Sequence, residues 1–159
     1  FGTGTHPTTA LCLEWLDGAD LTDKTVLDYG CSSGILAIAA ARLGAKRVWA
    51  VDIDPQTLLA SDSNASENEV EDRIELADPS ELPTALSVDI LLANILAEVL
   101  VRLAPEFGRR VKPKGRLVLS GILEPHADVV QAVFSREFSF APAQRREDWV
   151  LLEGVRRDG

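Results

Sequence analysis

Methionine is absent from all 159 residues, and cysteine and histidine occur only twice each. A chain that begins without methionine is expected to be part of a longer polypeptide. Two cysteines, Cys12 and Cys31, are too few for a disulfide framework or a cysteine-based zinc site. The scarcity of these residues excludes the small disulfide-rich and zinc-ribbon classes of protein. No bound metal is expected, and the reducing cytoplasm is the expected location.

Long apolar runs and excess positive charge are also missing. No stretch approaches the ~20 apolar residues of a membrane span, and no signal peptide is visible, so no membrane partner is expected. The 16 lysines and arginines face 25 acidic residues, a net charge of −9. This balance argues against direct nucleic-acid binding through a broad basic surface and suits a small-molecule ligand or a basic protein partner. Two short basic clusters, at 109–116 and 145–146, are expected to be solvated surface.

The residues that are present indicate one α/β domain. The chain is 46% hydrophobic, and β-branched apolar runs alternate with helical patterns along most of its length. Such alternation demands a parallel sheet with right-handed crossovers. The expected strands are 25–30, 47–54, 73–77, 88–95 and 116–123, and the expected helices are 8–17, 33–44, 55–68, a segment ending near 111, and 125–135.

The C-terminal segment breaks this alternation. Residues 138–156 read as two strands joined without a helix, and such a pair must be antiparallel. The predicted fold is therefore a doubly wound, Rossmann-like sheet of about seven mostly parallel strands with an antiparallel C-terminal strand. In such sheets ligands bind outside the carboxyl ends of the strands.

The first predicted strand runs into the stretch VLDYGCSSGILAIAA, residues 26–40. Gly30 allows a sharp turn and Gly34 lets the following helix begin close to a ligand, with its N–H groups at the sheet edge. A dinucleotide turn would need glycine where the chain has Ser32 and Ile35, and no P-loop is present. The stretch favours a nucleoside ligand without a tight phosphate cradle, and the alternative is a glycine turn that binds nothing.

Three further positions carry polar side chains that suit a ligand site. Asp52 ends the second strand, where a carboxylate can accept hydrogen bonds from both ribose hydroxyls, whereas Asp54 before Pro55 is expected to cap the next helix. Asn94 ends the fourth strand and can orient an amine nucleophile or bind an amino-acid ligand. His6, in the opening FGTGTHPTT, is either a general base or a loop histidine that binds backbone groups.

Together these segments resemble the class I S-adenosylmethionine-dependent methyltransferases and, more narrowly, the family of ribosomal protein L-eleven methyltransferases (PrmA). The resemblance covers essentially the whole chain. The post-strand aspartate and the turn after the first strand are shared by many methyltransferases, whereas FGTGTHPTT and ANILA in this order are much more specific. The matching stretches are FGTGTHPTTALCLEWL, VLDYGCSSGILAIAA, VDIDP, LLANILA, GRLVLSGIL and EDWVLLEG.

The resemblance implies roles for particular residues. Gly30 and its loop, with Gly34, would bind the methionine part of S-adenosylmethionine, and Asp52 would bind its ribose. Asn94 would lie beside the sulfonium and the target amine. The opening loop would close over the cofactor through Thr9. Phe1, Thr3 and His6 match the family in the same loop, and Phe1 and Thr3 are expected to contact the cofactor.

The chain departs from the family pattern at two points. The cofactor turn usually has glycine where this chain has Ser32, and a serine with positive φ costs on the order of 1 kcal/mol. Family members also carry an N-terminal substrate-recognition domain. Residues 1–159 are therefore expected to be the S-adenosylmethionine-binding catalytic domain alone, without that domain.

The resemblance implies methyl transfer to amino groups, on lysine side chains, the N-terminus or both, of a basic large-subunit ribosomal protein. Alternatives are another protein N-methyltransferase, a nucleic-acid N-methyltransferase of the same fold, or a cofactor-binding module without turnover. The nucleic-acid reading is weakened because Asn94-Ile-Leu-Ala lacks the prolines and the aromatic residue usual in that motif. The sequence does not define the oligomeric state.

Overall fold

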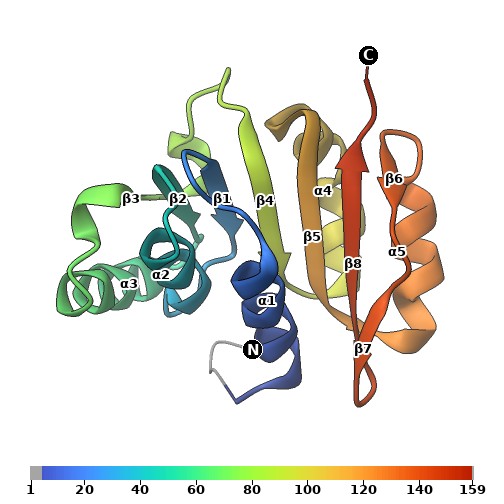
Figure 1. The fold of residues 1–159 in the computed structure, drawn as a ribbon, viewed down its shortest axis with the longest axis horizontal. Coiled ribbons are helices and arrows are strands. Elements are labelled where there is room, and N and C mark those ends of the chain that lie inside the picture. The colour runs from blue at the N-terminus through green and yellow to red at the C-terminus, as the bar shows by residue number, and fades with distance from the viewer. Residues whose placement is uncertain (1–4, 159) are drawn as a thin grey trace.

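The computed structural model describes residues 5–158 as one mixed sheet covered by helices on both faces (Figure 1). The helices are α1 (Pro7–Gly18), α2 (Ile35–Arg42), α3 (Pro55–Glu67), α4 (Ala97–Arg110) and α5 (Ala127–Phe134). The strands are β1 (Thr25–Tyr29), β2 (Arg47–Val51), β3 (Ile74–Ala77), β4 (Val88–Asn94), β5 (Val111–Leu123), β6 (Phe138–Phe140), β7 (Gln144–Arg146) and β8 (Trp149–Arg156). Short 3₁₀ turns lie at Glu71–Arg73, Pro79–Glu81 and Glu124–His126.

The strand order is β3-β2-β1-β4-β5-β8-β6, with β7 paired to β8. Strands β1 to β5 are parallel, and β8 runs antiparallel to β5, β6 and β7. The chain order reverses between β1 and β4, so their carboxyl ends flank a topological switch point, where doubly wound sheets bind ligands. This edge is the lower one in Figure 1.

The core forms two layers, one on each face of the sheet. Helices α1, α2 and α3 lie in front of it and α4 and α5 behind it in Figure 1. The central strand β4 is buried along almost its whole length, as its continuous apolar run predicts. Along β1, Val26 faces the α1 side and Leu27 the α4 side, because successive side chains alternate across a strand.

The predicted doubly wound topology is confirmed, but residues 5–158 form eight strands rather than about seven. The additional strand is β7, whose three residues are all exposed. It forms a hairpin with the start of β8, where Arg146 pairs with Trp149 and Glu147 turns the chain at φ 56°. An exposed strand has no alternating apolar pattern, so nothing in its sequence distinguishes it from a loop.

The expected turn at 113–115 lies inside β5 rather than before it. Val111 already pairs with Val88 of β4, and the register then shifts so that Ile90 faces Arg116. Lys114 adopts φ 67° within this bulge. The strand therefore begins five residues earlier than the sequence predicts, because pairing with β4 resumes on both sides of the bulge.

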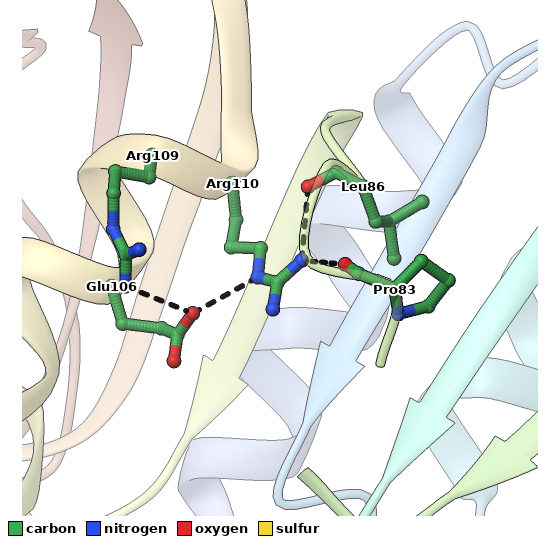
Figure 2. Close-up of polar contacts among 5 residues, drawn as sticks. All are labelled: Pro83, Leu86, Glu106, Arg109 and Arg110. Carbon is green, nitrogen blue, oxygen red and sulfur yellow. Dashed lines mark hydrogen bonds and ion pairs between the residues drawn. The ribbon is translucent and has the colours of Figure 1, made fainter. Parts of the chain in front are cut away.

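Arg110, in a basic cluster expected to be solvated, is buried at 7% exposure. Its guanidinium donates to the backbone carbonyls of Pro83 and Leu86 and pairs with Glu106 at 3.0 Å, whereas Arg109 stays exposed (Figure 2). The expectation was thus wrong for Arg110, which fastens the segment before β4 to the end of α4. None of the helices among residues 5–158 is long and apolar enough to cross a bilayer.

Candidate functional site

The loop between β1 and α2 depends on two glycines. Gly30 has φ 81°, and a Cβ there would lie 2.6 Å from Ile95 Cγ2. Gly34 has φ 87°, and its Cβ would lie 3.1 Å from the side chain of Ser61. Both positions combine a left-handed backbone with a close neighbour, so only glycine fits them without strain. The loop therefore lies tightly between the residue that follows β4 and helix α3.

Ser32 adopts φ 52° in the same loop. Its N–H donates to Asp52 Oδ2 at 3.1 Å, and its carbonyl accepts from Ser61 Oγ at 2.7 Å. These bonds hold a non-glycine residue in the left-handed region, which costs about 1–2 kcal/mol for an L-residue. The cost expected from the sequence applied only to the case of a positive φ, and the structure has that conformation.

Asp52, directly after β2, joins two loops of the site. Its Oδ2 accepts from Ser32 N, and its Oδ1 accepts from Asp54 N at 3.1 Å. Asp54 caps α3 by accepting from Gln56 N, as expected for a residue before Pro55. The Asp52 carboxylate is thus held in one orientation at the switch point while remaining partly exposed.

Asn94 ends β4 and is 9% exposed. Its Nδ2 donates to Thr9 Oγ1 of α1 at 3.3 Å, and its Oδ1 has no hydrogen-bond partner within the described part of the chain. Thr9 is fully buried, and the neighbouring Thr8 carbonyl accepts from Ser120 Oγ of β5. Helix α1 therefore fixes the side-chain amide of Asn94, whose buried oxygen retains an unused capacity to accept a hydrogen bond within the described part of the chain.

Asp28 is a buried carboxyl group that the sequence analysis did not assign. It is 1% exposed on the α1 face of β1, and neither carboxyl oxygen has a well-aligned hydrogen-bond donor among residues 5–158. Burial raises its pKa to about 7; the backbone amide of Ala37 acts to lower this pKa, and the charge of Asp52 acts to raise it further. A signal existed: an acidic residue inside an apolar strand, two positions before the glycine turn.

The two cysteines lie close to Asp28 and are free thiols. Burial, with the Asp28 charge second, raises the pKa of both Cys12 and Cys31 to about 12. A thiolate nucleophile is therefore disfavoured at neutral pH. Within residues 5–158, no three His, Cys, Asp or Glu side chains are grouped so as to hold a metal ion.

A hollow of about 410 Å³ opens at the switch point, and we call it the β1–β4 hollow. Its polar wall contains Gly30, Ser32, Asp52 and Asn94, so the structure brings these predicted positions together. The rest of the lining is mainly apolar, and this combination is typical of small-molecule sites. Sequence reasoning did not anticipate the apolar members, Tyr29, Val51, Ile53, Pro79, Ile95, Leu96, Val99 and Leu103.

The opening segment is only partly described. Phe1 and Thr3 lie outside the described residues. His6 is the N-cap of α1: its Nδ1 accepts from Thr8 N at 3.2 Å, and its ring packs edge-on against Trp149 with centroids 5.3 Å apart. This geometry matches the interpretation of His6 as a residue that binds backbone groups. Thr9 lies within α1 rather than in the loop, and its contact with a cofactor stays a prediction.

The sheet order, the glycine loop and the post-β2 aspartate together define a Rossmann-like fold of the class I methyltransferase type. The solved structure of a ribosomal protein L11 methylase from Lactobacillus delbrueckii subsp. bulgaricus superimposes with a TM-score of 0.89 at 32% identity, covering 98% of this chain and 81% of that one. An RNA methyltransferase from Salinibacter ruber, solved with S-adenosyl-L-homocysteine, shares the fold at a TM-score of 0.75 and 20% identity, over 94% of this chain and 92% of that one.

Sequence comparison narrows the class to one family. The family model described as ribosomal protein L11 methyltransferase (PrmA) matches residues 1–157, and the chain belongs to this family. The ribosomal protein L11 methyltransferase of Methylococcus capsulatus is 62% identical over 158 residues, which are 99% of this chain and 54% of that protein. That of Shewanella halifaxensis is 54% identical over 157 residues, with the same coverage of each chain. The chain thus spans about half the length of these relatives.

Proposed function

We propose that this chain binds S-adenosylmethionine in the β1–β4 hollow and directs methyl transfer to amino groups of a ribosomal protein of the L11 type. The observation that carries the proposal is the buried amide of Asn94, whose Oδ1 has no hydrogen-bond partner among residues 5–158 and which lines the same hollow as Gly30 and Asp52. The names of the relatives supply the substrate class.

The residues of the hollow fit this cofactor. Gly30 and Gly34 keep side chains out of the loop where a ligand backbone would approach, and Asp52 presents an oriented carboxylate for ribose hydroxyls. The apolar wall, including Ile53, offers a surface for an adenine ring.

Asn94 would position the amine. Bound S-adenosylmethionine supplies a methyl group on a positively charged sulfur, which takes the C–S bonding electrons as the amine nitrogen forms the new bond. A lysine amine has a reference pKa near ~10.4 and must first lose a proton, which passes to water. Asn94 Oδ1 can then accept a remaining N–H of the amine and aim its lone pair, because Thr9 fixes the amide.

The partner and location are part of the same proposal. A net charge of −9 favours a basic protein substrate over direct nucleic-acid contact, and two free buried thiols suit the reducing cytoplasm. The acceptor amines are lysine side chains, the N-terminus or both. Residues 1–159 are proposed to form the cofactor-binding catalytic unit.

Transfer of a labelled methyl group tests the reaction. The purified protein is incubated with S-adenosylmethionine carrying a radioactive methyl group and with separated ribosomal proteins or ribosomal RNA. Label in one basic ribosomal protein of the L11 type is expected. Label in RNA would favour the nucleic-acid alternative, and the absence of label with intact cofactor binding would favour a non-catalytic module.

Two substitutions separate cofactor binding from chemistry. Asp52→Ala removes the ribose carboxylate and should weaken S-adenosylhomocysteine binding about 10–100-fold, since a hydrogen bond to a charged group contributes about 1.5–3 kcal/mol. Asn94→Ala should change that affinity only a few-fold but lower turnover about a hundredfold, because the amine is no longer aimed. Isothermal calorimetry and the methyl-transfer assay measure the two effects. Unchanged binding in Asp52→Ala would refute its assignment.

A further inference from the structure

A second hollow, of about 450 Å³, adjoins the β1–β4 hollow at the same edge of the sheet. We call it the β5–α5 hollow. Its walls come from the start of α4, the end of β5, the N-terminal part of α5 and Trp149 at the start of β8. Leu96, two residues after Asn94, belongs to the lining of both hollows.

The walls of the β5–α5 hollow are mainly apolar and open to solvent. Leu96 is 51% exposed and Val129 of α5 is 60% exposed. Val101 of α4 and the ring of Trp149 line the interior. Exposed apolar groups that gather around a concavity mark a binding site more often than isolated surface residues do.

Glu98 and His126 carry the titratable side chains among the described lining residues. Glu98 lies in the first turn of α4, four residues after Asn94, and no lysine or arginine among residues 5–158 forms an ion pair with it. No lysine or arginine belongs to the described lining. The hollow thus combines apolar walls with a single carboxylate, which complements a side chain that has an aliphatic stem and a cationic end.

We propose that the β5–α5 hollow receives the amine-bearing side chain of the protein substrate, a lysine. The aliphatic stem packs on Leu96, Val101 and Val129, and Glu98 attracts the ammonium group to the mouth. Past Leu96 the nitrogen reaches Asn94 in the adjoining hollow. This inference rests on the proposed function, because it makes the same site specific for a basic side chain.

Kinetic measurements on two variants test the assignment. Glu98→Gln should raise KM for the ribosomal protein about fivefold with kcat and S-adenosylhomocysteine affinity nearly unchanged, since a rim charge acts mainly on encounter. Val129→Lys, an exposed position that tolerates substitution, should raise KM about tenfold by placing a like charge at the mouth.

Two control substitutions lie on α5, the helix that carries Val129. Asp128→Asn removes a carboxylate from the first turn of α5, and Val133→Lys alters a valine of α5 that is 40% exposed; neither residue is part of the described lining. Both controls should leave KM within about twofold. Equal KM changes in variants and controls, or no change in Glu98→Gln and Val129→Lys, would overturn the proposal.

A binding measurement decides the inference independently of turnover. Methyl NMR resonances of Leu96, Val101 and Val129 are followed as N-acetyl-lysine methylamide is added at millimolar concentration in the presence of S-adenosylhomocysteine. Shifts are expected with this amide and not with N-acetyl-glutamate methylamide. If the methyl resonances do not shift when the lysine amide is added, the assignment of the β5–α5 hollow as a lysine site is overturned. Shifted methyl groups without any methyl transfer would refute the proposed function alone.

Discussion

At the scale of single residues, the site is built from groups placed against their ordinary preferences. Ser32 occupies the left-handed region, Asp28 is a carboxyl group in the core, and Asn94 keeps a buried oxygen without a described partner. Each of these placements raises the free energy of the folded protein when no ligand is bound. Such departures cluster where a ligand is proposed to bind, and this concentration is itself evidence for a functional edge.

Ser32→Gly should stabilise the protein by about 0.5–1 kcal/mol. Glycine removes the cost of a positive φ, which is about 1–2 kcal/mol for an L-residue. Part of this gain in stability is lost, because glycine also gives the unfolded chain greater conformational entropy. Urea unfolding measures the gain, which corresponds to about 2 °C in Tm. Ser32→Ala is the control, because it retains Cβ and should bring no gain. A gain of equal size in both variants would contradict the strain argument.

Asp28→Asn should change how stability depends on pH. The folded-state pKa of Asp28 is raised to about 7 from 3.8, so its neutral form is retained in the fold while the unfolded chain ionises. The wild-type free energy of unfolding, relative to the variant, is therefore highest below pH 4 and falls by up to about 4 kcal/mol as pH rises through 7. Urea titrations from pH 4 to 8 measure the difference. A difference that stays constant over this range would show that Asp28 is ionised in the fold.

At the scale of elements, helix ends fasten the loops that lead into the central strands. Arg110, at the end of α4, holds the carbonyls of Pro83 and Leu86 immediately before β4 (Figure 2). Helix α1 holds the other end of the same strand through Thr9 and Asn94. Strand β4, which carries the proposed amine-positioning residue, is thus anchored at both ends.

Arg110→Ala should destabilise the fold by about 2–3 kcal/mol, because two carbonyls and the carboxylate of Glu106 lose a charged donor. Arg109→Ala is the matched control: it contacts the same Glu106 at 3.4 Å, but its side chain is 69% exposed. Its removal should cost less than about 0.5 kcal/mol. Chemical denaturation of both variants makes the comparison. Similar losses would mean that burial of Arg110 adds nothing.

At the scale of the whole molecule, alternating apolar patterns were enough to predict the parallel strands, their crossovers and the edge that carries Gly30, Asp52 and Asn94. Periodicity reports burial along one element, so it could not reveal β7, which is wholly exposed. Nor could it reveal the burial of Arg110 or the pairing of Asn94 with Thr9, 85 residues away. These contacts depend on how distant elements meet, which no local window of sequence records.

The packing of α1 also has a consequence for the order of folding. Thr9 bonds to a strand 85 residues later, and the Thr8 carbonyl to one 112 residues later. Contacts between such distant segments form slowly, because the intervening chain must be ordered before they stabilise anything. Helix α1 precedes every strand in the chain, yet its docking surface exists only once β4, β5 and β8 have assembled. We therefore expect the side chain of Asn94 to become oriented late in folding, after the strands that contact α1 have paired.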